Sequence, residues 1–162
     1  MFIGAAENPF ADPFEFRVIR LAKKVKAGAD FIQTQAVYDV PKFARWMEMV
    51  CERGLDKQVH ILAGIIPIRT SGAARYMQTS VPGVAVPDEI VKRMRAAEAK
   101  GGEDKKLKAE YGREEGIKIS LELIEQVKQI PGVHGIHLMA VGWEDIVPSL
   151  IEKAGLLPRP SL

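Results

Sequence analysis

The 162-residue sequence contains a single cysteine, Cys51, so no intrachain disulfide can form. Its formal net charge is only +2 and charges of both signs are interspersed, which argues against a nucleic-acid partner. No apolar run approaches the ~20 residues that a membrane-spanning helix needs. Residues 1–9 also lack the basic start and long apolar stretch of a signal peptide. These absences favour a cytoplasmic protein that binds neither nucleic acid nor membrane.

Short motifs with a strong chemical meaning are also scarce. The sequence has no glycine-rich phosphate loop, no Gly-x-Ser-x-Gly turn and no Cys-x-x-Cys pair. Its histidines do not predict a metal site, because His134 and His137 are three residues apart on a predicted strand and point to opposite faces, while His60 stands alone. We therefore expect no bound metal, and we assign no catalytic residue within this chain.

The sequence does contain a regular alternation of strand and helix patterns. The predicted strands span residues 2–6, 31–35, 59–66 and 135–141. The predicted helices span residues 13–26, 41–54, 71–78, a segment that begins at Pro87, a long segment that ends before Pro131, and a last segment that ends at Gly155. Strict alternation predicts an α/β fold with a parallel sheet, interrupted by a helical insertion at about residues 70–100.

Four parallel strands allow two architectures. One is an open, doubly wound sheet. The other is half of a closed TIM barrel, which needs eight βα units and typically ~250 residues. The missing half would then come from an N-terminal part, a second chain or a second copy of this chain. Half a barrel leaves two edge strands and an apolar face uncovered, so we expect the chain to associate into an oligomer.

Two groups of polar residues are candidates for ligand binding. Arg17, Arg20 and Lys24 fall within a ~60° arc of the first predicted helix, where they could hold a phosphate or pyrophosphate. The alternative for this arc is a solvated basic face. Gln33 and Gln35 share one face of the second strand, and an amide at a strand end can bind a flat, hydrogen-bonding ring. The alternative for Gln35 is a polar residue satisfied by the neighbouring backbone.

Five segments of the chain carry a resemblance to a known family. The most distinctive is KVKAGADFIQTQ, at residues 24–35. The others are GIIPI at 64–68, VPDEI at 86–90, YGREEGI at 111–117 and GIHL at 135–138. In order and almost without gaps, they resemble the barrel of methylenetetrahydrofolate reductases over nearly the whole chain.

The resemblance implies a TIM barrel that carries FAD and reduces methylenetetrahydrofolate to methyltetrahydrofolate in one-carbon metabolism and methionine biosynthesis. Residues 1–157 would supply its C-terminal four βα units, followed by a tail at 158–162. The implied partners are the folate substrate and an N-terminal barrel half or partner subunit. The family's folate-protonating acid and an aspartate near the flavin belong to the earlier strands, so we expect no catalysis by this chain alone.

The resemblance also assigns cofactor positions. Lys24 matches a family lysine near the FAD phosphates, and Lys23 lies where an arginine is also used. Asn8 and Arg20 occupy flavin-contacting positions, although both differ in type from the residues expected there. The basic arc of the first helix is thereby interpreted as part of an FAD site.

On the substrate side, Gln35 matches the family glutamine that contacts the folate and nicotinamide rings. Met139 and Trp143 take the places of a tyrosine and an arginine of the folate site. Tryptophan cannot reproduce the bidentate ion pair that arginine forms with a glutamate tail. Met77 and Ala73 also depart from residues that contact the nicotinamide and substrate. A protein electron donor, or a different pterin tail, is therefore one hypothesis.

Two alternatives remain beside the reductase. The chain could be a non-catalytic binding or assembly protein that kept the half-barrel and lost the chemistry, which the departures at the substrate site favour. It could also belong to another barrel enzyme that acts on pterins, such as a methyltransferase, in which case no flavin would bind. Trp143 has its own alternative, because a tryptophan just past a strand can simply anchor the following helix on the core.

Overall fold

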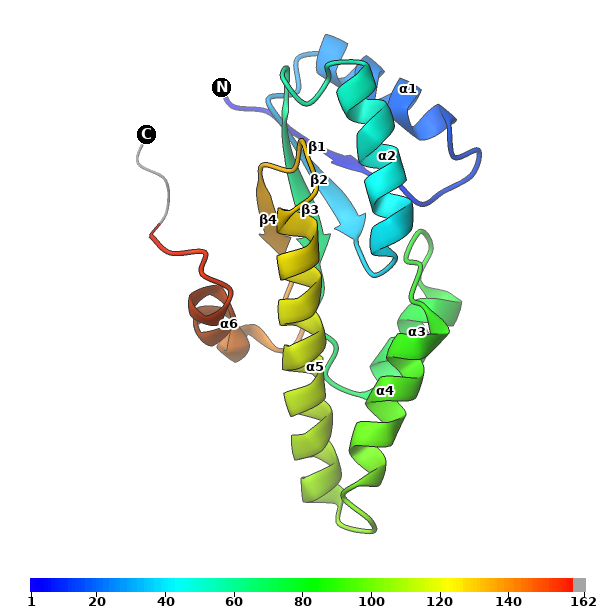
Figure 1. The fold of residues 1–162 in the computed structure, drawn as a ribbon, viewed down its shortest axis with the longest axis vertical. Helices are drawn as coiled ribbons and strands as arrows, with labels where there is room; N and C mark the ends of the chain where they lie inside the picture. Colours follow the sequence, from blue (N-terminus) through cyan, green and yellow to red (C-terminus); the bar gives the residue numbers. More distant parts are fainter. Residues whose placement is uncertain (159–162) are drawn as a thin grey trace.

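The computed structural model describes residues 1–158 as an α/β fold with one parallel sheet (Figure 1). Its strands are β1 (Gly4–Glu7), β2 (Phe31–Ala36), β3 (His60–Ile65) and β4 (Gly135–Leu138), in the spatial order β1-β2-β3-β4. Its helices are α1 (Phe16–Lys26), α2 (Val40–Glu52), α3 (Ser71–Ser80), α4 (Asp88–Ala99), α5 (Lys105–Lys128) and α6 (Val147–Lys153). The predicted α/β class and parallel sheet are confirmed. Residues 159–162 of the predicted tail lie outside the described residues.

Three helices begin at a side chain that caps their free backbone N–H groups. Asp39 accepts a hydrogen bond from the backbone N–H of Lys42 at 2.9 Å before α2, and Thr70 accepts from that of Ala73 at 3.0 Å before α3. Asp104 caps the start of α5 in the same way. Each cap satisfies donors that the helix itself cannot pair, which fixes where the helix begins.

The two faces of the sheet differ in burial. Right-handed crossovers between neighbouring parallel strands place the connecting helices α1, α2 and α5 on one face. On that face, Ile32, Ile61 and Ile65 are fully buried. On the opposite face, Phe31 is half-buried and His60 is exposed. The core therefore lies between the sheet and one layer of helices, and the other face is the more open one.

Helices α3 and α4 occupy the segment between β3 and α5 in which the sequence predicts an insertion. Helix α4 packs along α5. The resulting hairpin extends past the carboxyl ends of the strands (Figure 1). The loop at residues 81–87, which joins α3 to α4, returns toward the carboxyl ends of the strands and becomes important below.

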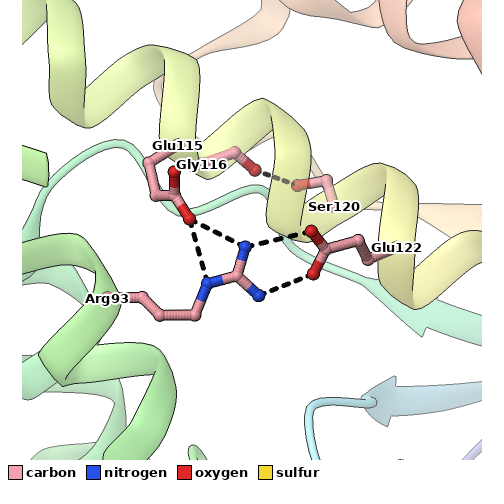
Figure 2. Close-up of polar contacts among 5 residues, drawn as sticks. All are labelled: Arg93, Glu115, Gly116, Ser120 and Glu122. Atoms are coloured by element: carbon pink, nitrogen blue, oxygen red, sulfur yellow. Dashed lines mark hydrogen bonds and ion pairs between the residues drawn. The ribbon is translucent and has the colours of Figure 1, made fainter.

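Arg93 on α4 joins this helix to α5 through two carboxylates of α5 (Figure 2). Its guanidinium donates to Glu115 at 2.7 and 2.9 Å and to Glu122 at 2.6 and 3.0 Å. The hydrogen bond with Glu122 is the main cause that raises the pKa of Arg93, and it holds the pKa of Glu122 below its usual range. Figure 2 also shows buried Ser120, whose hydroxyl donates to the carbonyl of Gly116 at 2.7 Å within α5.

Two predicted boundaries were wrong. Helix α1 begins only at Phe16, because the residues before it form turns. Strand β4 ends at Leu138, earlier than predicted. After the N–H of Met139 donates to the carbonyl of Ile65, the N–H of Val141 turns back to the carbonyl of Met139 at 3.0 Å, which ends the ladder.

Replacing Arg93 with methionine should lower the free energy of unfolding by about 1 kcal/mol, the upper end for a partly exposed ion pair. The reason is that two carboxylates on α5 lose their shared guanidinium. Arg95→Met is the matched control, because Arg95 is exposed on the same helix. Urea unfolding measures both, and equal losses for the two variants would contradict this role of Arg93.

The contribution of Arg93 should also depend on pH. Because the pKa of Glu122 is lower in the folded state, its stabilisation is complete above the unfolded-state pKa of about 4.3. It is then lost as the pH falls through the folded-state pKa. The difference in stability between wild type and Arg93→Met should therefore shrink below pH ~4. A difference that is unchanged between pH 7 and pH 3 would speak against the ion pair.

Candidate functional site

A cavity of about 440 Å³ opens at the carboxyl ends of β1, β2 and β4. Its walls carry three cations from α1, a carboxylate and an amide from the end of β1, and two amides, an imidazole and a thioether from β2 and β4. Ligand sites of parallel α/β folds lie at this end of the strands. The position and the mixture of polar groups make this cavity the candidate functional site.

The cationic wall consists of Arg17, Arg20 and Lys24, the arc that the sequence predicts. Nη2 of Arg17 donates to the carbonyl of Asp12 at 2.8 Å. Its buried Nε has no hydrogen-bond partner within residues 1–158. Lys23 does not line the cavity: it is exposed, and its Nζ lies 5.8 Å from the centroid of the Phe16 ring. An anion in the cavity could thus be reached by three of the four predicted basic residues.

A buried ion pair ties this wall to the sheet. Glu7, only 4% exposed, accepts from Lys24 Nζ at 2.5 Å and from the backbone N–H of Asn8 at 3.1 Å. Lys24 also donates to the carbonyl of Ala6 at 2.6 Å, so one of its three N–H groups remains for a ligand. Glu7 was not among the predicted site residues. Its position directly after an apolar strand indicates a buried carboxylate, and a buried carboxylate requires a cation.

Strand β2 is irregular where it borders the cavity. Its pairing with β3 shifts between Gln33 and Ala36, and the hydroxyl of Thr34 accepts from the backbone N–H of Gly64 at 2.9 Å. Irregularities of this kind re-aim side chains next to functional sites. Oε1 of Gln35 accepts from the backbone N–H of Ala36 at 3.0 Å. The neighbouring backbone therefore satisfies the amide oxygen of Gln35, as the alternative for this residue predicts.

The α3–α4 loop closes one side of the same region. Nε2 of Gln35 donates to the carbonyl of Pro82 at 3.5 Å. Gly83 has a positive φ of 80°, and a β-carbon there would overlap Nδ2 of Asn8. Asn8 in turn accepts from the backbone N–H of Phe10 at 3.0 Å through Oδ1. Two predicted site residues, Asn8 and Gln35, thus both contact the helical insertion.

On the far side of the cavity, His137 lies next to Gln33. The amide Nε2 of Gln33 is 3.0 Å from Nδ1 of His137. Desolvation by burial lowers the pKa of His137, so the imidazole is neutral at pH 7. The sequence predicted no metal site at His137 and assigned this histidine no other role. Its proximity to Gln33 depends on strand order, which residue spacing alone does not reveal.

Of the two remaining predicted substrate residues, only Met139 lines the cavity. Trp143 is buried at 6% exposure. Its ring lies 3.6 Å from the position that a β-carbon of Gly116 in α5 would occupy. Trp143 therefore packs on the core, which is the alternative that the sequence left open for it.

The family model described as Methylenetetrahydrofolate reductase matches residues 6–155. This chain belongs to that family. It is 29% identical over 143 residues to Methylenetetrahydrofolate reductase 2 of Schizosaccharomyces pombe and 28% identical over 141 residues to that of Saccharomyces cerevisiae. These matches cover 86% and 87% of the chain but only 21% and 22% of the relatives, so the chain spans about a fifth of their length.

A solved structure has the same fold. It is an uncharacterized protein from Clostridium thermocellum that binds two copies of 5-methyl-5,6,7,8-tetrahydrofolic acid, at a TM-score of 0.59 and 16% identity. The match covers 96% of the present chain and 53% of the other. The two proteins therefore share a fold over about half of the other chain.

Residues 1–158 of this reductase-family chain contain neither a candidate metal site nor a membrane-spanning helix. No group of three or more histidine, cysteine, aspartate or glutamate side chains is arranged to hold a metal ion. None of the helices in that range has the length and apolarity that crossing a membrane would require.

Replacing Lys24 with methionine should lower the free energy of unfolding by roughly 3 kcal/mol, because it leaves the buried carboxylate of Glu7 without its cation. Glu7→Gln should cost less, since the half-buried Lys24 can still reach water. The double variant Glu7→Gln/Lys24→Met should be more stable than Lys24→Met alone. Urea unfolding of all three tests the pair, and a double variant that loses the sum of both single losses would refute it.

Proposed function

We propose that this chain is the C-terminal half of a methylenetetrahydrofolate reductase barrel, in which it holds FAD through α1 and one side of the folate through β2 and β4. One observation carries the proposal: three cations, the amides of β2 and an imidazole line one cavity at the carboxyl ends of the strands, in a chain of the reductase family.

The half-barrel is supported by the sheet itself. Strands β1 and β4 are its edges, and neither has a second neighbour within residues 1–158. The face away from α1, α2 and α5 exposes Gly4 and His60 and only half buries Phe31 and Leu62. Four further βα units would pair both edges and cover this face. The solved structure of the same fold is about twice as long as the matched region.

The cationic wall fits the diphosphate of FAD. The remaining N–H of Lys24 is a donor that an anion would satisfy, and Arg17 adds positive charge to the same wall. Arg20 is exposed beside them and adds charge. Asn8 borders the same wall from the end of β1. Lys23 lies outside the cavity and is left out of this assignment. The cavity volume is within the ~300–1,000 Å³ common for ligand sites.

The opposite wall fits a folate ring. Gln35 keeps an amide N–H for a ligand, and Met139 offers an apolar surface beside it. FAD, when bound, supplies the hydride that reduces methylenetetrahydrofolate. The residues of this chain bind and orient both partners and exclude water. The acid that protonates the folate would come from the other half, so we expect no turnover by the chain alone.

Titration of the purified chain with FAD, followed by visible absorbance and flavin fluorescence, tests the cofactor site. Arg20→Gln should weaken binding roughly 10- to 100-fold, the usual effect of losing one charged hydrogen bond. Lys23→Gln is the matched control, because it removes an equal charge from the same helix outside the cavity. Equal effects of both variants would contradict the phosphate assignment. A monomeric chain that binds no FAD would favour the non-catalytic alternative.

A further inference from the structure

Side chains from β2 and β4 meet on one face of the sheet across β3. In the register, Gln33 pairs with Leu62, and Gly64 pairs with His137. Paired residues of parallel strands share a face, so Gln33 and His137 point to the same side with β3 between them. A β-carbon at Gly64 would lie only 2.8 Å from Cε of Met139. The missing side chain at Gly64 therefore leaves room for Met139 on this face.

The contact between Gln33 and His137 defines the tautomer of the imidazole. The amide nitrogen of Gln33 can only donate, so Nδ1 of His137, at 3.0 Å, must accept. In a neutral imidazole, the proton then resides on Nε2. Desolvation by burial disfavours the doubly protonated ring, which would have no acceptor for Gln33. His137 thus keeps one donor, Nε2–H, that the amide does not use.

This donor has no protein partner. Within residues 1–158, no hydrogen bond involves Nε2 of His137. His137 lines the cavity next to Gln35, whose Oε1 is already engaged with its own backbone. His137 therefore offers an N–H donor to this end of the cavity. A ring carbonyl next to a ring N–H, the lactam group that flavins and pterins share, is the acceptor that such donors recognise.

We propose that His137, positioned by Gln33, donates its Nε2–H to the lactam carbonyl of a ring bound in this cavity. The inference rests on the proposed function, because that function supplies the ring. Neither the basic arc nor Gln35 provides this contact. Gln33 acts as a positioning residue for this donor, because its amide N–H fixes the tautomer of His137.

The tautomer is tested directly by ¹⁵N NMR of the histidine rings in the full chain at pH 7.5. We expect His137 to show a protonated Nε2 and an unprotonated Nδ1. Gln33→Met should remove this preference and give a mixture of tautomers. His60 and His134 are internal references, because they line a separate cavity at the other end of the sheet. A wild-type His137 with its proton on Nδ1 would overturn the proposal whether or not a ligand binds.

Ligand binding gives the second readout, with FAD and 5-methyltetrahydrofolate used as separate probes. His137→Phe keeps a flat ring without the donor and should weaken binding of one probe about 3- to 10-fold. His137→Gln places an amide N–H near the former Nε2 and should recover most of that loss. The probe that responds identifies whether the carbonyl belongs to the flavin or to the pterin.

The outcomes separate the two proposals. Binding of both probes with unchanged affinity in His137→Phe would reject the donor and leave the proposed function standing. Failure of the folded wild-type chain to bind either probe would reject the proposed function of this chain, and the donor with it. Weaker binding in His137→Phe with recovery in His137→Gln supports both.

Discussion

The irregularity of β2, closed by the hydrogen bond from the N–H of Gly64 to the hydroxyl of Thr34, is the constraint on which the cavity depends. Because the hydroxyl takes a place in the ladder, Gln35 is displaced from a regular register and its amide turns to its own backbone and to Pro82. On one face of the sheet, the amide of Gln33 reaches His137 across β3. The irregularity of β2 thus sets the direction of Gln35 at the cavity, while the strand order brings Gln33 to His137.

The Glu7–Lys24 ion pair has a comparable role for the cationic wall. A buried carboxylate is costly without a cation, so the pair holds α1 against the end of β1 and keeps Lys24 at the cavity edge. It also lowers the local positive charge in the absence of ligand, since one of three cations is matched by an acid. An incoming anion would share Lys24 with Glu7 and Arg17 with the carbonyl of Asp12, whereas the exposed Arg20 has no such partner within residues 1–158.

Local patterns in the sequence predicted what depends on local rules. Helical spacing brought Arg17, Arg20 and Lys24 to one arc, and the alternation of strands and helices gave the parallel sheet. What the sequence left undecided depends on neighbours in space. The pairing of Glu7 with Lys24 depends on how α1 packs on β1, and residue spacing alone does not identify that partner. The contact of Trp143 with α5 decides between the two roles that the sequence left open for it. Lys23 adjoins Lys24 in sequence but does not line the cavity.

The helical insertion contributes to the geometry of the site. Arg93 anchors α4 on α5, and Gln78 on α3 donates to the carbonyl of Val86 at 2.9 Å and to Asp88 at 2.8 Å, which fixes both ends of the α3–α4 loop. That loop presents the carbonyl of Pro82 to Gln35. A change in the packing of α4 on α5 would therefore move an acceptor of Gln35. The insertion acts on the Gln35 side of the cavity through its loop, and the same loop contacts Asn8 at the end of β1.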